Sequence, residues 1–106
     1  MSNSEIKIYQ LEDGQTEVQV RFDNETVWLT QTQMVELFQA TKQNISLHIR
    51  NIFKEGELQE ISVVKDYLTA ASDGKRYNTK HYNLDLIISI GYRINLKRGT
   101  QFKLWN

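Results

Sequence analysis

The segment TQTQMVELFQATKQNISLHIRNIFKEG, at residues 30–56, decides the fold that the sequence predicts. Thr30 and Gln33 form a capping-box pattern, in which a hydroxyl and a side-chain amide each pair with a free backbone N–H at a helix start. Thr41 is a second N-cap candidate, and Gly56 is placed to end the second helix in a left-handed conformation. Apolar residues at helical spacing predict the two buried helix faces: Met34, Leu37 and Phe38, then Ile45, Ile49, Ile52 and Phe53. Two short helices joined by a turn near Ala40 are typical of a helix-turn-helix.

The second helix has a polar side opposite its isoleucines. Five residues share this side at helical spacing: Gln43, Ser46, Leu47, Arg50 and Lys54. Glutamine can pair with the edge of adenine, arginine can pair with guanine, and leucine can touch a thymine methyl group. We therefore expect base contacts from Gln43, Ser46 and Leu47 in the first turns, because these turns reach the base edges in this class. Arg50 should also read bases, and Lys54 suits a phosphate.

The starts of both helices add expected phosphate contacts. Lys42 and Thr41 are placed for the flanking phosphates, and Thr30 and Gln31 begin the first helix, where free backbone N–H groups favour an anion. A polar outer face is also what any helical hairpin shows. The exposed Leu47 could instead be covered by another part of the chain or by a dimer partner.

The region before the helices predicts a small β-meander over residues 1–29. Residues 6–9 and 18–22 alternate between apolar and polar, and residues 26–29 read as a third short strand. The pair Asp13-Gly14 favours a tight hairpin turn, and residues 23–25 read as a second turn. Most acidic side chains of the region fall on what we expect to be its outward face.

A second hairpin follows the helices and would act as a wing. After a loop at residues 57–62, two runs at residues 63–70 and 75–83 flank the turn pair Asp73-Gly74. We assign the wing to residues 62–83. Its tip and second strand carry side chains that would lie against the phosphate backbone or in a minor groove: Lys75, Arg76, Lys80 and His81.

The C-terminal part predicts helices. Residues 84–94 have helical spacing with Asn83 as the cap, residues 97–100 should break this helix, and residues 101–105 should open another. The whole chain thus predicts an α+β fold, a winged helix-turn-helix with an N-terminal β-meander, as one domain over residues 1–106. We expect the helices at residues 84–106 to be cut from a longer protein.

Composition limits the function classes. The 106 residues suit one domain, and the absence of cysteine removes disulfides, thiolate zinc sites and a cysteine nucleophile. No apolar run approaches a membrane span and the N-terminus lacks a signal-peptide pattern, so we expect a cytoplasmic protein without membrane contact. The net charge is zero, but residues 1–29 hold six acids against two bases and residues 61–106 hold eight bases against three acids. An anionic partner would therefore meet one side of the molecule.

Catalytic and metal-binding patterns are thin. His48 and His81 are far apart in the sequence, and His48 reads better as a partly exposed helix residue than as a base or ligand. No paired carboxylates, clustered metal ligands or glycine-rich phosphate loop stand out. We expect no enzyme activity, no metal and no cofactor, and rank an enzyme last.

Several blocks resemble the virulence RhuM family of bacterial proteins. They are VWLTQ at 27–31, NISLHI at 44–49, FKEGEL at 53–58, YNLD at 82–85, GYR at 91–93 and RGTQF at 98–102. The resemblance implies a DNA-binding protein linked with mobile or horizontally acquired DNA, in a family whose members are much longer. Similar N-terminal modules are also joined to death-on-curing (Fic-type) domains. A missing C-terminal region would then be a further partner of this chain.

Two functions of different classes follow. The first is sequence-specific binding of double-stranded DNA, as a transcription regulator or as the DNA-targeting module of a longer RhuM-like protein. The alternative is a protein–protein interaction or dimerisation module, with Leu47 and the C-terminal helix as the contact. A homodimer would impose DNA half-sites about 34 Å apart.

Overall fold

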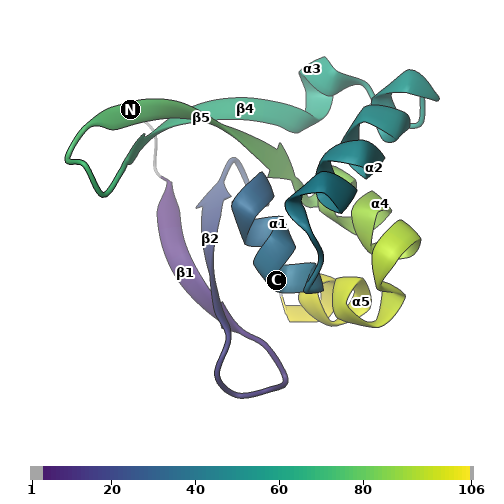
Figure 1. Cartoon of the computed structure of the whole chain (residues 1–106), viewed down its shortest axis with the longest axis horizontal. Coiled ribbons are helices and arrows are strands. Elements are labelled where there is room, and N and C mark those ends of the chain that lie inside the picture. Colours follow the sequence, from purple (N-terminus) through teal and green to yellow (C-terminus); the bar gives the residue numbers. More distant parts are fainter. Residues whose placement is uncertain (1–3, 106) are drawn as a thin grey trace.

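The computed structural model describes residues 4–105, which form an α+β fold with helices packed on one face of an antiparallel sheet (Figure 1). Its strands are β1 (Glu5–Gln10), β2 (Glu17–Asp23), β3 (Thr26–Thr30), β4 (Val64–Ala70) and β5 (Arg76–Asn83). Its helices are α1 (Gln31–Phe38), α2 (Lys42–Lys54), α3 (Glu60–Val63), α4 (Leu84–Ile94) and α5 (Leu96–Trp105). Within residues 4–105, no helix has both the length and the apolar character needed to cross a membrane.

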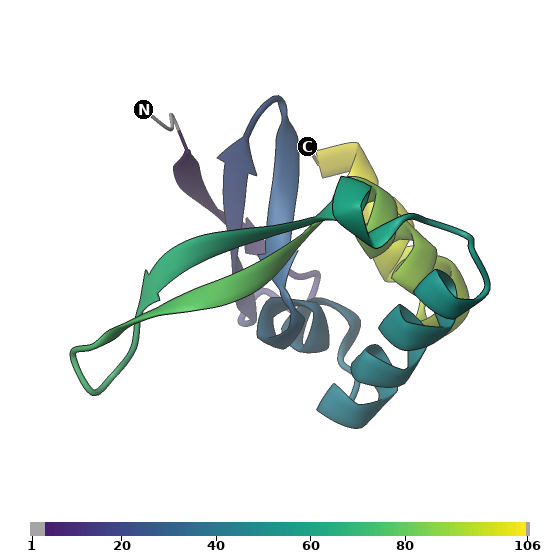
Figure 2. The ribbon, with the colours of Figure 1, turned by 90° about the horizontal axis from the view of Figure 1, so that it is seen from above.

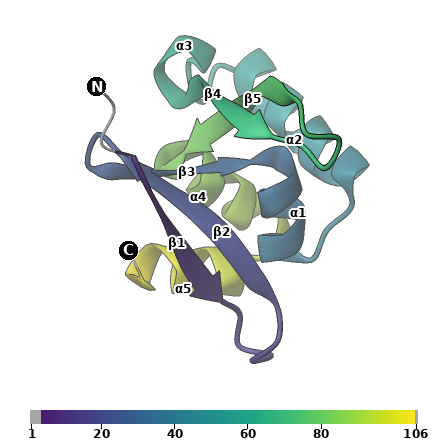
Figure 3. The ribbon, with the colours of Figure 1, turned by 90° about the vertical axis from the view of Figure 1, so that its left-hand side faces the viewer.

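The five strands form one sheet in the order β1-β2-β3-β5-β4. The predicted meander is confirmed as β1, β2 and β3, and the predicted second hairpin is confirmed as β4 and β5. The two parts join where β3 pairs with β5 over three residues, with Leu29 opposite Tyr82. The hairpin extends well beyond this short junction, and it points away from the meander at a steep angle (Figures 2 and 3).

The apolar core lies between the sheet and the helices. Val18 and Val20 of β2 and Leu29 of β3 are fully buried against Leu37 of α1 and Ile87 of α4. These residues alternate with exposed polar ones in β2, as the sequence predicts for a strand with one buried face.

Strand β1 buries the face opposite to the one that its pattern predicts. Ile6 and Ile8 are each 49% exposed, whereas Tyr9 is buried. The register explains the difference, because Tyr9 lies opposite the core residue Val18 and the isoleucines therefore point to the other face. Tyr9 then packs edge-on against Trp105 of α5, with ring centroids 4.9 Å apart.

The outward face of the meander is less acidic than expected. Asp23 is buried, and Lys65 Nζ of the second hairpin lies 3.1 Å from its carboxylate. Glu12 at the first turn lies 3.4 Å from Lys97 of α5. Two of the acids that the sequence placed at the surface therefore neutralise cations of the same chain.

The helix starts match the sequence signals. The Thr30 hydroxyl accepts from the Gln33 N–H at 3.1 Å, and the Gln33 side chain accepts from the Thr30 N–H at 2.9 Å, which completes the capping box. Thr41 and Asn83 cap α2 and α4 through their side-chain oxygens. Gly56 ends α2 with a φ of +76°, a conformation that glycine adopts without strain. Its N–H donates to the Phe53 carbonyl, so the predicted left-handed ending is confirmed.

Two local predictions are wrong. Helix α3 occupies the second half of the expected loop at residues 57–62 and extends to Val63, so β4 begins at Val64. The expected break at residues 97–100 lies inside α5, because the chain turns already at Asn95. Gly99 is not a helix breaker here but a contact point, since a Cβ on Gly91 of α4 would lie only 3.1 Å from its Cα. The two glycines let α4 and α5 cross at close range.

Candidate nucleic-acid interface

Helix α2 exposes the side that the sequence assigned to DNA. Ile45, Ile49 and Ile52 are buried, and the opposite side carries Gln43, Leu47, Arg50 and Lys54, all exposed, with Ser46 half-buried. The helix contains no acidic residue and three basic ones: Lys42, Arg50 and Lys54. This face is therefore polar, cationic and open.

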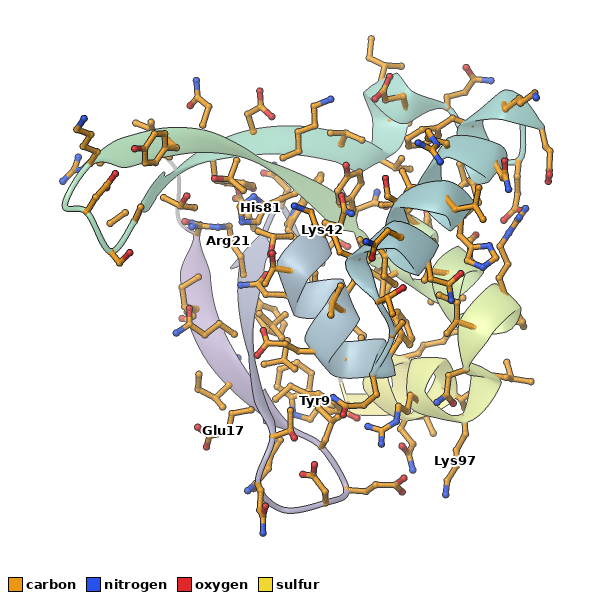
Figure 4. All side chains as sticks on the ribbon, viewed as in Figure 1. Tyr9, Glu17, Arg21, Lys42, His81 and Lys97 are labelled. Atoms are coloured by element: carbon orange, nitrogen blue, oxygen red, sulfur yellow. The ribbon has the colours of Figure 1, made fainter. Side chains whose placement is uncertain are left out.

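An open hollow of about 320 Å³ lies where the start of α1 meets the start of α2. Five residues line it, and all five belong to the set picked out from the sequence: Gln31, Lys42, Gln43, Ser46 and Arg50. Gln31 Nε2 donates to the Lys42 carbonyl at 3.2 Å and joins the two helices at this point. Lys42 lies at the start of α2, next to α1 (Figure 4). The hollow combines amide, hydroxyl and cationic groups, which are the groups that pair with base edges and phosphates.

Most of the predicted DNA-binding cations carry no acidic partner. Among residues 4–105, no salt bridge involves Lys42, Arg50, Lys54, Lys75 or Arg76. Lys80 differs, because its Nζ lies 4.0 Å from the Glu60 carboxylate of α3. Five of the six cations are therefore available to an external anion.

The N-caps of α1 and α2 have different surroundings. Thr41 uses its hydroxyl to accept from the Asn44 N–H at 3.1 Å and stays exposed next to Lys42. Thr30 instead lines a neighbouring hollow together with Glu17 and Glu36. Two carboxylates beside it disfavour a phosphate, so Thr30 is a weaker candidate than its neighbour Gln31.

The second hairpin carries two of its cations at the tip. Lys75 and Arg76 are exposed at the tip, where the Asp73 carboxylate accepts from the Lys75 N–H at 2.9 Å and Gly74 adopts a φ of +82°. The hydrogen bonds from the Tyr77 hydroxyl and the Lys75 N–H hold the pKa of Asp73 below its usual value. The Asp73 carboxylate thus accepts hydrogen bonds from the turn itself and forms no salt bridge with the Lys75 or Arg76 side chain within residues 4–105.

His81 does not contribute to a phosphate-binding surface. Its side chain is 2% exposed, next to Arg21 on the sheet face away from the helices (Figure 4). Burial lowers the pKa of His81, and the charge of Arg21 lowers it further. A buried, neutral imidazole cannot act as the surface cation that the sequence pattern predicts.

The hairpin and α2 extend from the body on either side of α1 (Figure 2). The tip of the hairpin and the start of α2 lie on the same side of the molecule in this view. Lys75 and Arg76 at the tip and Lys42 and Gln43 at the start of α2 can therefore face one extended partner.

The described residues also bear on the question of a metal site. Within residues 4–105, no group of three or more histidine, cysteine, aspartate or glutamate side chains could hold a metal ion. His48 lies on α2 and His81 is buried on β5, so the two histidines do not form one site.

Comparison with known protein families gives a match to the C-terminal part of the chain. The model of the Virulence protein RhuM family matches residues 62–106, so the resemblance noted in the sequence is confirmed over this range. The matched range contains β4, β5, α4 and α5, whereas α1 and α2 precede it. Searches of curated proteins and of solved structures give no match.

Proposed function

We propose that this chain binds double-stranded DNA in a sequence-specific manner as a winged helix-turn-helix module. Helix α2 enters the major groove, and the β4–β5 hairpin is the wing that contacts the adjacent backbone. The module serves as a transcription regulator, or as the DNA-targeting part of a longer RhuM-like protein. Such a role belongs in the bacterial cytoplasm.

The hollow at the start of α2 is the observation that carries the proposal. Gln31, Lys42, Gln43, Ser46 and Arg50 come from two helices and line one open surface. Arg50 can donate two hydrogen bonds to guanine, and the amide of Gln43 can pair with both edge atoms of adenine. Lys42 beside them suits a phosphate at the groove edge.

The test is a selection of bound duplexes from a random DNA library. The wild-type chain should enrich a defined sequence, and Arg50→Ala should relax the preference at one base pair at a cost of about 1–3 kcal/mol. Lys103→Ala is the matched control, because Lys103 is an exposed cation of α5 outside the proposed interface. An Arg50→Ala variant with an unchanged preference would refute the base-reading role.

A second function of another class has its own observation. Leu47, Tyr92, Leu96 and Leu104 are large apolar side chains that stay 44–80% exposed. The last three line a hollow of about 270 Å³ between α4 and α5. Exposed apolar groups gathered in this way are typical of a surface that binds another protein.

Light scattering separates the two functions. Self-association that Leu47→Lys or Leu104→Lys abolishes, in a chain that does not retain any duplex from the library, would favour the interaction module. A monomer that binds a defined duplex would favour the DNA-binding function.

A further inference from the structure

The sheet face opposite the helices carries a second group of buried and half-buried side chains, which we call the outer cluster. It consists of Arg21, Asp23, Trp28, Lys65, Tyr67 and His81, from β2, β3, β4 and β5. The register places these residues on one face, since Arg21 pairs with Trp28 and Lys65 pairs with His81. The apolar core occupies the other face, so the outer cluster is a separate structural unit.

Asp23 lies at the centre of the outer cluster. Its carboxylate accepts from Lys65 Nζ at 3.1 Å and from the Tyr67 hydroxyl, and its backbone carbonyl accepts from Trp28 Nε1 at 3.1 Å. Asp23 and Trp28 are 8% and 7% exposed. A buried carboxylate stays charged only where such partners compensate for lost water, so these contacts hold one another in place.

Aromatic and cationic contacts extend the outer cluster around Tyr67. The Arg21 guanidinium lies 4.3 Å from the centre of the Tyr67 ring, and the His81 ring meets that ring edge-on at 4.9 Å. Burial and the hydrogen bond to Asp23 raise the pKa of Tyr67, so its hydroxyl keeps the proton that it donates. The outer cluster is therefore packed as well as hydrogen-bonded.

The backbone alone leaves the direction of the hairpin weakly defined. Within residues 4–105, strand β4 pairs only with β5, and β5 pairs with the meander only at His81, Tyr82 and Asn83. The rest of the hairpin is a two-stranded ribbon, which twists and bends more readily than a wider sheet. Lys65 and Tyr67 are on β4, so their bonds to Asp23 connect this outer strand directly to the meander.

We propose that Asp23, acting through Lys65 and Tyr67, sets the direction of the β4–β5 hairpin relative to the helices. On the proposed DNA-binding function, on which this last step rests, Asp23 is a positioning residue that aligns Lys75 and Arg76 with the duplex. It touches no DNA itself.

The first experiment measures the direction of the hairpin without DNA. The chain contains no cysteine, so spin labels can be placed at Ser72→Cys near the hairpin tip and Lys103→Cys on α5, both exposed positions. Electron–electron double resonance should give one narrow distance distribution in the parent. Asp23→Asn and Tyr67→Phe should broaden or shift it.

Asp66→Asn is the matched control. Asp66 is an exposed carboxylate on β4, and within residues 4–105 no salt bridge involves it, so its removal should leave the distribution unchanged. Should Asp23→Asn fail to fold by circular dichroism, Tyr67→Phe decides, because it removes a single hydroxyl. An unchanged distribution in a folded Tyr67→Phe or Asp23→Asn variant overturns the proposal.

The second experiment measures binding to the selected duplex at several salt concentrations. Losing two phosphate contacts should reduce the slope of log affinity against log salt by about 1.8. Asp23→Asn should therefore behave like the double variant Lys75→Ala, Arg76→Ala, and combining all three changes should reduce the slope no further. A parent that binds no duplex would refute the proposed function but leave the distance test valid, whereas additive slope losses would refute the positioning role.

Discussion

The salt dependence of the proposed DNA binding gives the most quantitative test of the proposed interface. Four predicted phosphate-binding side chains are exposed and make no salt bridge within residues 4–105: Lys42, Lys54, Lys75 and Arg76. Each neutralised phosphate contributes about −0.9 to the slope of log affinity against log salt, so four contacts predict a slope of about −3.6. Raising the salt from about 50 to about 200 mM should then weaken binding about 150-fold.

The perturbation is Lys54→Ala at the end of α2. Removing one phosphate contact should change the slope to about −2.7, so the same salt step should weaken binding only about 40-fold. The assay is fluorescence anisotropy of a labelled selected duplex at five or more salt concentrations. Lys80→Ala should change the slope less, because Lys80 already lies 4.0 Å from Glu60.

Lys103→Ala is the control for loss of one positive charge. Lys103 is exposed on α5, outside the proposed interface, so the slope of log affinity against log salt in this variant should stay at the wild-type value. An unchanged slope in Lys54→Ala, or an equal reduction in Lys103→Ala, would refute a phosphate contact at Lys54. The second result would mean that net charge, rather than placed contacts, governs binding.

Three further predictions concern stability. Gly91→Ala should lower the melting temperature in calorimetry, because the new Cβ would lie 3.1 Å from the Gly99 backbone and 3.4 Å from the Phe38 ring. Overpacking costs about 1–3 kcal/mol, which exceeds the gain of about 1 kcal/mol in helix propensity. A higher melting temperature would contradict the close crossing of α4 and α5. Burial lowers the pKa of His81, so the contribution of its neutral form to the free energy of unfolding should be complete above about pH 6.5 and be lost as the pH falls further. Urea unfolding at several pH values should show this loss in the parent chain and not in His81→Phe. Thr41→Ala should cost about 0.5–2 kcal/mol in the same unfolding assay, and no loss would argue against the cap.

The helix pair was predictable because its signals are local. The capping box at Thr30 and Gln33 and the glycine after α2 each act within a few residues, and the structure contains both. The open face of α2 follows from the same short-range periodicity, since burying Ile45 and Ile49 leaves Gln43 exposed. This explains why Gln43, Ser46 and Arg50, which share one side of α2 by their spacing, line one hollow. Gln31 and Lys42 complete the lining from the starts of the two helices.

The errors arose where distant parts of the chain decide the outcome. Ile6 and Ile8 are the apolar positions of the alternating pattern at residues 6–9, but the register with β2 turns Tyr9 inward instead. Asp23 looked like a surface acid, and no local signal marks its partners Lys65 and Tyr67, which follow 42 and 44 residues later. Gly99 looked like a helix end, because a sequence does not reveal that Gly91 will pack against it.

Thr30 links three units of the fold at once. It is the last residue of β3, it pairs with His81 at the base of the hairpin, and it caps α1. No spacer residue separates strand from helix here, so deleting a single residue before Thr30 would reverse the pleat and rotate α1 by about 100° about its axis. The orientation of Gln31 and the root of the hairpin would change together. The fold therefore tolerates a substitution of an exposed side chain here more readily than a change in chain length at this junction.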